Sequence, residues 1–246
     1  MTIQPAGKPR SILLEQLPAD VMARLAPDLN KVDLAAGKVL CKAGVVPSHV
    51  YFPCSGLVSM RYLTSNGDAG EIASVGNEGV IGATLLFGSV PNAIRAVVQT
   101  PGTAVSLKTD AGLREFARNG IFQAVVLRYT TWLLAQVTQA AICNRHHSIE
   151  QQLSRWLLAG FDRLGGDQVQ VTHEALANLL GVRREGITEA AGRLQDAGGI
   201  RCGRGSIRLV DRRELEQRAC ECYLSLKRAY ARLAGPGLAA PGATAS

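Results

Sequence analysis

The chain has 246 residues, of which 47% are hydrophobic and 19% charged. This globular composition excludes a mostly disordered chain, and the length suits one or two domains with a buried core. Lys and Arg number 27 against 20 Asp and Glu, which gives a net charge of +7. That excess is compatible with a nucleic-acid partner but does not by itself identify one.

No stretch of the sequence resembles a secretory signal or a membrane span. The most apolar run, Thr131 to Cys143, is shorter than the roughly 20 residues that span a bilayer, and it contains Gln136 and Gln139. The six cysteines are scattered, as is typical of reduced thiols rather than of a disulfide framework. We therefore expect a cytoplasmic protein with no membrane partner.

The two ends, residues 1–11 and 234–246, are rich in Ala, Gly and Pro and are predicted to be flexible tails. Residues 11–29 have the apolar spacing of a helix. Between residues 32 and 107, short apolar runs separated by turn residues predict an antiparallel β sandwich or barrel, with Asn66-Gly67 as a hairpin turn. The predicted strands are Val39–Cys41, Val50–Phe52, Leu57–Tyr62, Ile72–Val75, Val80–Leu86, Ala96–Gln99 and Thr103–Leu107.

A long helix is predicted from about Phe122 to Asn144, because apolar positions there recur at alternating steps of four and three residues. Such a seam either pairs with a second copy of the helix or packs against the chain's own β domain. We favour the dimer, since a seam of this length exceeds what one small β domain needs. The predicted dimer seam consists of Phe122, Val126, Tyr129, Leu133, Gln136, Ala140 and Cys143.

The region after this helix predicts a helix-turn-helix. Ser148 and Gln151 form a capping box for a helix that ends at Leu164. Thr172 then caps a short helix, Gly181 supplies a turn, and a second helix runs from about residue 183 to 197. In this motif the start of the second helix enters the DNA major groove. The residues that it would present there are Arg183, Arg184, Glu185, Thr188 and Glu189.

A β-hairpin follows, formed by Ile200–Cys202 and Ser206–Val210 around the turn Gly203-Arg204-Gly205. A helix-turn-helix followed by such a hairpin is a winged helix. Arg204 at its tip, together with Thr172 and His173, is suited to phosphate contacts, which position a protein without reading sequence. A small helical bundle with a solvated basic face is the alternative, but it does not explain this order of elements.

The segment Val171 to Thr188 resembles the helix-turn-helix of the Crp/Fnr family of bacterial transcription regulators. The resemblance implies an α+β chain: an N-terminal antiparallel β-roll of the cyclic-nucleotide-binding type at 12–120, a dimerisation helix at 121–146 and a C-terminal winged helix at 147–233. It implies base contacts by Arg184 and Glu185 and a phosphate contact by Thr172. The implied partners are double-stranded DNA, a second copy of the chain, RNA polymerase and an unknown small-molecule effector. Glu189 replaces a base-contacting Arg of some members.

The expected effector site departs from the cyclic-nucleotide binders of that family. They carry a Glu in a Gly-Glu-Leu turn for the ribose, where this chain has Ala83 after Gly82, and an Arg for the phosphate. Here Arg95 matches that Arg only after a shift of two residues. We therefore expect no cyclic AMP binding, because both charged anchors are missing. Gly82 and Arg95 are kept as candidate ligand residues.

The sequence predicts neither a metal site nor another cofactor. Cys41 and Cys54 are too few and too far apart for the iron–sulfur cluster of the family's oxygen sensors. His146-His147, near Cys143, is interpreted as a polar joint. Cys220-Glu221-Cys222 is one residue short of a Cys-x-x-Cys motif and is expected on one helix from about residue 212 to 233, which argues against zinc. A redox role of these two cysteines stays open.

Three classes of function are open to such a chain: an enzyme, a ligand-binding module and a DNA-binding regulator. No nucleophile–base set indicates an enzyme, and a cupin-like metal enzyme would need more than His49 in the β region. A ligand-binding module that controls a partner protein would not need the basic helix and wing. Eight arginines and four acids between residues 183 and 213 favour a sequence-specific DNA-binding regulator that binds a pseudo-palindromic site as a homodimer.

Overall fold

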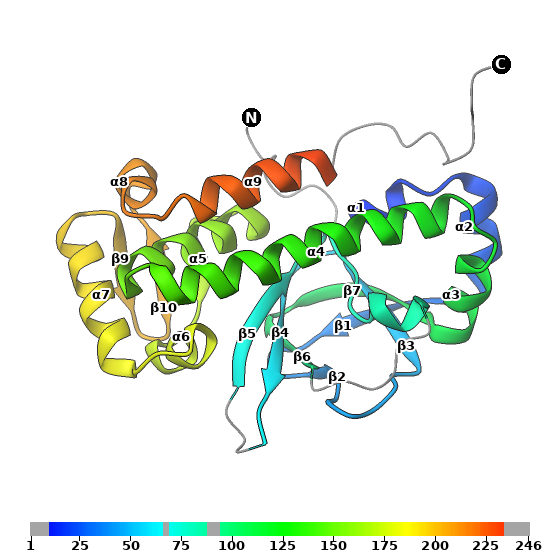
Figure 1. The fold of residues 1–246 in the computed structure, drawn as a ribbon, viewed down its shortest axis with the longest axis horizontal. Coiled ribbons are helices and arrows are strands. Elements are labelled where there is room, and N and C mark those ends of the chain that lie inside the picture. The colour runs from blue at the N-terminus through cyan, green and yellow to red at the C-terminus, as the bar shows by residue number, and fades with distance from the viewer. Residues whose placement is uncertain (1–9, 66–68, 88–93, 234–246) are drawn as a thin grey trace.

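In this computed structural model, residues 10–65, 69–87 and 94–233 are described. Figure 1 shows a β-rich half and a helical half joined by the long helix α4 (Ile121–His146), which runs along both. The predicted tails lie outside the described residues except for Arg10 and Ser11, and the Ser11 side chain caps helix α1 (Ile12–Glu15). The fold is the predicted α+β arrangement.

Two antiparallel sheets form the β-rich half. One has the strand order β1-β7-β3 and the other β2-β6-β4-β5. Six of the seven predicted runs correspond to strands, and β1 is a further strand that none of the predicted runs covers. The bounds are β1 (Leu29–Leu34), β2 (Val39–Cys41), β3 (His49–Pro53), β4 (Leu57–Leu63), β5 (Ala69–Val75), β6 (Ile94–Thr100) and β7 (Gly102–Lys108).

Two predictions for this half are wrong. The run Val80–Leu86 is not a strand: it makes one isolated bridge from Ile81 to Tyr51, and Gly82, with φ of +87°, then turns the chain into the 3-10 helix η2 (Ala83–Phe87). The single helix expected over 11–29 is broken into α1, α2 (Ala19–Leu25) and the 3-10 helix η1 (Ala26–Asp28). Pro18 and Pro27 explain the breaks, because proline disfavours helix interiors. The Asn66-Gly67 turn lies outside the described residues.

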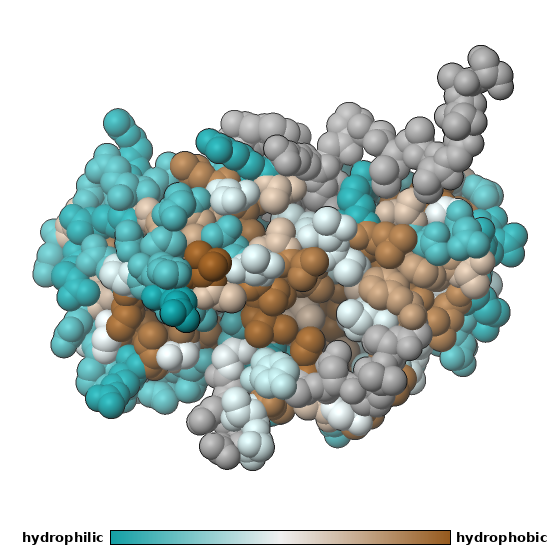
Figure 2. Space-filling view, in the orientation of Figure 1, coloured by the Kyte–Doolittle hydropathy of each residue, from teal (hydrophilic) through white to brown (hydrophobic). Residues whose placement is uncertain are grey.

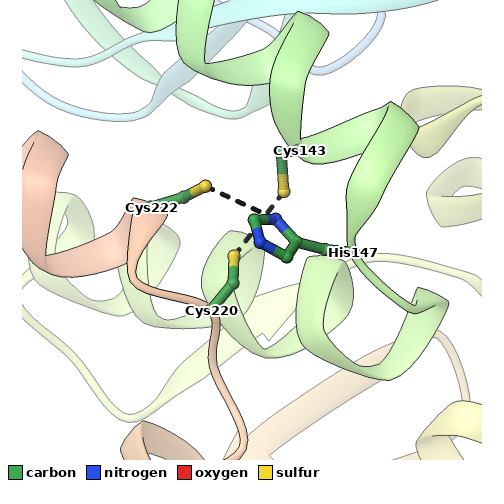
Figure 3. A group of neighbouring side chains, drawn as sticks. All are labelled: Cys143, His147, Cys220 and Cys222. Carbon is green, nitrogen blue, oxygen red and sulfur yellow. Dashed lines mark hydrogen bonds between the residues drawn. The ribbon is translucent and has the colours of Figure 1, made fainter.

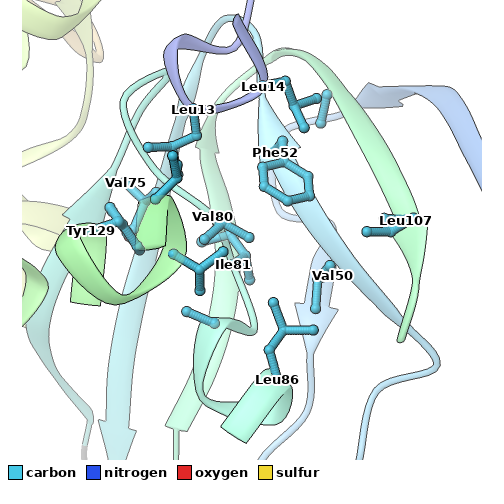
Figure 4. Packing of buried hydrophobic residues seen from close by; sticks show 14 of the residues in the cluster. Leu13, Leu14, Val50, Phe52, Val75, Val80, Ile81, Leu86, Leu107 and Tyr129 are labelled. Carbon is cyan, nitrogen blue, oxygen red and sulfur yellow. The ribbon is translucent and has the colours of Figure 1, made fainter. Parts of the chain in front are cut away.

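The core of this half lies between the sheets, helix α4 and the short helix α3 (Thr109–Phe116). Figure 4 shows Val80 beside Tyr129, which α4 contributes to the core cluster. Phe52 and Leu107 of the sheet belong to the same cluster. Tyr129 is fully buried. Burial of apolar area at about 25 cal/mol per Å² therefore fixes α4 on the β-rich half.

That packing corrects the predicted dimer seam. Phe122, Val126, Tyr129 and Leu133 belong to the core of their own chain, and Gln136 and Cys143 are buried as well. Ala140 is half-buried. The six buried side chains are unavailable to a second subunit, and they pack within their own chain instead. A heptad pattern shows that a helix has a buried face but not which partner buries it.

The helical half begins with α5 (Ile149–Leu164), where Ser148 and Gln151 make both bonds of the predicted capping box. A small sheet of order β8-β10-β9 packs beside the helices, whose core includes Leu157, Leu176 and Leu194. The helix predicted over 212–233 is interrupted between residues 217 and 222. The remaining bounds are β8 (Gln168–Gln170), α6 (His173–Leu180), α7 (Arg184–Asp196), β9 (Ile200–Gly203), β10 (Ser206–Leu209), α8 (Arg212–Gln217) and α9 (Cys222–Leu233).

Arg163 at the end of α5 joins the two halves. Its Nε donates to Glu78 Oε1 at 2.9 Å, and its other nitrogens donate to Ser74 and to Gln136 of α4. The guanidinium lies 5.6 Å from the ring centre of Trp132. Glu78 is 1% exposed and Arg163 13%, so this ion pair is shielded from solvent.

A second polar contact crosses the same boundary. Trp156 of α5 donates its indole N–H to Glu71 Oε1 at 3.0 Å. Burial raises the pKa of Glu71, because the protein interior penalises its ionised form. None of the helices in the described part of the chain combines the length and apolar character that crossing a bilayer requires.

We predict that Arg163→Ala strongly destabilises the chain. The substitution leaves the Glu78 carboxylate buried without its cation, which typically costs about 3–5 kcal/mol. Urea denaturation measures the loss. The control is Arg208→Ala, which removes an exposed ion pair with Asp167 and should cost about 0–1 kcal/mol. Equal unfolding free energies for the two variants would contradict the assignment.

Candidate nucleic-acid interface

Helices α6 and α7 form the helix-turn-helix as predicted. The Thr172 hydroxyl accepts from the Ala175 N–H at 3.1 Å and so caps α6. Gly181 ends α6 with φ of +66°, a conformation that favours glycine. The predicted inner face of α7 is buried against α6 and α5, and its small alanines allow close helix approach. It consists of Ile187, Ala190, Ala191 and Leu194.

The outer face at the start of α7 carries exposed charges. Arg183 is the N-cap residue, and Arg184, Glu185 and Glu189 follow on the solvent side. Within the described residues, none of these four side chains makes a hydrogen bond or an ion pair. Arg183, Arg184 and Glu185 also lie at the positive end of the helix dipole, which favours an anionic partner. The arrangement leaves the two guanidinium groups and the two carboxylates available to an external ligand.

Thr188 and His173 form a link between the two helices. His173 Nδ1 lies 3.2 Å from Thr188 Oγ1, and that hydroxyl donates to the Arg184 carbonyl at 3.1 Å. Because the Thr188 hydroxyl proton is donated to that carbonyl, the Thr188 oxygen accepts a hydrogen bond from the His173 imidazole N–H. Thr188 and His173 are therefore less available to contact DNA than predicted, because their polar atoms already bind each other and hold the first turn of α7.

The wing lies next to the start of the helix-turn-helix. The turn between β9 and β10 contains Arg204, which is exposed and makes no ion pair with the described residues. The neighbouring Gly205 carbonyl accepts from the Val171 N–H at 2.9 Å. This bond places Arg204 beside Thr172, so the two predicted phosphate contacts come from adjacent segments.

The arginines between residues 183 and 213 fall into two groups. Arg193 binds Glu150 at 2.7 Å, Arg208 lies 4.0 Å from Asp167, and Arg212 binds Asp162 and Glu216. These three guanidinium groups are therefore paired with acids of their own chain. Those without a side-chain partner among the described residues are Arg183, Arg184, Arg201, Arg204 and Arg213. The sequence could not separate the groups, because the acidic partners come mostly from other elements.

A cavity of 280 Å³ lies between the β-rich half and α4. Its wall is mostly apolar, and Lys42 is its single charged lining residue among those described. Gly82 and Ala83 line it, as predicted for the effector turn, whereas Arg95 does not and is exposed. Figure 2 shows brown, apolar side chains gathered over the middle of this face, where α4 crosses the β-rich half.

Comparison with known proteins matches both halves. Residues 31–119 match the cyclic nucleotide-binding domain family, and residues 151–218 match the Crp-like helix-turn-helix domain family. The chain is 24% identical over 217 residues to a CRP-like cAMP-activated global transcriptional regulator of Mycobacterium tuberculosis. The match covers 85% of this chain and 97% of that protein.

Solved structures share the fold. A regulator of the Crp/Fnr family from Eubacterium rectale superposes with a TM-score of 0.67 at 16% identity, covering 88% of this chain and 97% of that one. FixK2 from Bradyrhizobium japonicum superposes with a TM-score of 0.66 at 16% sequence identity, and the match covers 78% of this chain and 98% of FixK2. The chain belongs to the Crp/Fnr family of DNA-binding transcription regulators.

Proposed function

We propose that the start of α7 reads base edges in the DNA major groove. The observation that carries this proposal is the group of exposed side chains Arg183, Arg184 and Glu185, which are unpaired within the described residues at the end of a helix. A guanidinium binds guanine O6 and N7 through two bonds, and a carboxylate accepts from cytosine N4. Arg184 and Glu185 are assigned these roles.

The flanking residues hold the protein on the DNA backbone. Thr172 and Arg204 lie side by side and are assigned to phosphates. His173 and Thr188 position the first turn of α7 through their mutual bond. Glu189 is assigned to the rim of the groove. Its negative charge there disfavours the DNA sequences that a basic residue at the same position would bind.

The proposed regulator is a homodimer that pairs through the outer face of α4. Leu127 is 45% exposed, Leu134 63% and Ile142 49%, and all three lie on the side of α4 away from its buried residues. Exposed positions step by four and three residues, which is the spacing of a two-stranded seam. This face, opposite the seam predicted from sequence, consists of Leu127, Thr131, Leu134, Thr138 and Ala141. Two copies would place their α7 helices in successive major grooves of a pseudo-palindromic site.

The proposed effector is not cyclic AMP, although the Mycobacterium tuberculosis relative is described as activated by it. Ala83 offers no carboxylate to the ribose, and the exposed Arg95 lies outside the cavity lining. The apolar wall suits a ligand with an apolar body. Because Leu133 and Leu134 of α4 line this cavity, a ligand there would contact the proposed dimer helix directly.

A module that controls a partner protein is the other function compared, and nothing in the site favours it. The Crp-like match covers the region such a module would use for docking. RNA polymerase as a partner, and the cytoplasm as the location, stay predictions of the family resemblance.

Arg184→Ala should weaken binding to the preferred DNA site by about 1–3 kcal/mol and relax its sequence preference. The reason is the loss of a bidentate contact with guanine. Fluorescence anisotropy on a selected site and on single-base variants measures both effects. Arg118→Ala removes the same charge far from the interface and should leave the preference unchanged. An unaltered base preference in the Arg184 variant would refute the assignment.

Leu134→Glu should shift the protein from dimer to monomer, because it buries a charge in the proposed seam. Sedimentation velocity at several protein concentrations detects the change. Leu224→Glu is the matched control, since Leu224 is also exposed, at 52%, but lies on α9. Dissociation by both variants, or by neither, would contradict the proposed face.

Cyclic AMP should show no specific binding at micromolar concentrations. Isothermal titration calorimetry on the intact protein measures this directly, with a cyclic AMP-binding regulator as the positive control. Saturable micromolar binding that Arg95→Ala abolishes would overturn the proposal and assign Arg95 to the phosphate.

A further inference from the structure

Four potential metal ligands meet where α4 ends. Cys143 lies in the last turn of α4 and His147 is its C-cap residue, whereas Cys220 lies in the break between α8 and α9 and Cys222 is the first residue of α9. Figure 3 shows the three thiols gathered around the imidazole of His147. One ligand atom from each residue can be chosen so that all four lie within 4.8 Å of one another.

This group is not evident from the sequence, because its two pairs of residues lie more than 70 positions apart along the chain. A continuous helix over residues 212–233 would point Cys220 and Cys222 in different directions. The observed break brings both inward, where Cys143 and Cys222 are fully buried and Cys220 is nearly so. The three cysteines form a cluster apart from the two apolar cores, so they do not simply fill a core.

We propose that Cys143, His147, Cys220 and Cys222 bind one Zn²⁺ ion. Three thiolates and one imidazole are an established ligand set for structural zinc.

The spacing of the ligand atoms fits a single ion. In a tetrahedral site with Zn–S bonds of about 2.3 Å, neighbouring ligand atoms lie about 3.8 Å apart. The Cys143 and Cys220 sulfurs are 3.6 Å apart, and Cys222 Sγ is 3.5 Å from His147 Nδ1. The ligands of an iron–sulfur cluster bind different irons and must lie farther apart. The present spacing therefore favours a mononuclear site.

The surrounding groups match those that support metal ligands. His147 binds through Nδ1, and its Nε2 lies 3.2 Å from the Glu221 carboxylate, which orients the ring as histidine ligands are usually oriented. Gln139 of α4 donates to Cys222 Sγ, which stabilises a thiolate.

The charge of the site is also partly compensated. Arg155 lies close enough to Cys143 to interact with it electrostatically. Metal binding would release the thiol protons to solvent and leave a site with a net charge of −1, which Arg155 offsets.

The location gives the site a mechanical role. The four ligands join the end of α4 to the connection between α8 and α9, at the point where the chain enters the DNA-binding half. A bound ion would fix that half relative to α4, and removal of the ion or oxidation of the thiols would release it. This inference does not depend on the proposed DNA contacts.

Metal content of the full-length protein tests the proposal. After incubation with Zn²⁺ and a reductant and removal of free ion, elemental analysis should find about one zinc per chain. Cys220→Ser and Cys222→Ser should lose most of it, and their melting temperatures should fall toward that of chelated wild type. Cys202→Ser, a half-buried cysteine on β9, is the matched control and should retain the zinc.

A second measurement does not depend on the variants folding. Wild-type protein loaded with Co²⁺ should show the visible absorption of a tetrahedral thiolate site, and Zn²⁺ should displace it. No bound metal, an octahedral Co²⁺ spectrum, an iron–sulfur chromophore, or equal zinc in the Cys202 and Cys220 variants would overturn the proposal. A Cys143–Cys220 disulfide that persists in reductant would overturn it too.

Discussion

The buried pair of Arg163 and Glu78 is the constraint on which the arrangement of the two halves depends. A shielded carboxylate must keep its cation, so α5 can move away from the β-rich half only by exposing both charges to water together. Because the same guanidinium also binds Gln136 of α4, one side chain links the cavity-bearing half, the long helix and the DNA-binding half. Arg163 is therefore a direct physical connection between α4 and the helical half.

The DNA-binding half was the most predictable part of the chain. Its signals are local: Ser148 and Gln151 make a capping box within one turn, Gly181 is the residue that tolerates positive φ, and α7 buries one clear face. The β strands were also found, since apolar runs and turn residues alternate. Gly82 was the exception, because a left-handed glycine inside an apolar run converts an expected strand into a turn.

The sequence was misleading where long-range packing decides. The heptad on α4 is real, but Tyr129 and Leu133 meet their own sheets, and Leu127 and Leu134 face outward. The metal-ligand cluster could not be predicted from spacing either, since 77 residues separate Cys143 from Cys220. The sequence shows only two cysteines with a single residue between them and a histidine four residues after another cysteine, and neither fragment alone indicates a four-ligand site.

Three polar connections thus converge around α5. Arg163 binds its C-terminal end to the β-rich half. Glu150 in its first turn binds Arg193 of α7 and Arg218 of the α8–α9 connection, whose cations lower the pKa of its carboxyl. The cysteine cluster joins that same connection to α4. The apolar face of α7 fixes that helix against α5 and α6, and the ion pair between Glu150 and Arg193 adds a polar contact that a buried apolar core cannot provide.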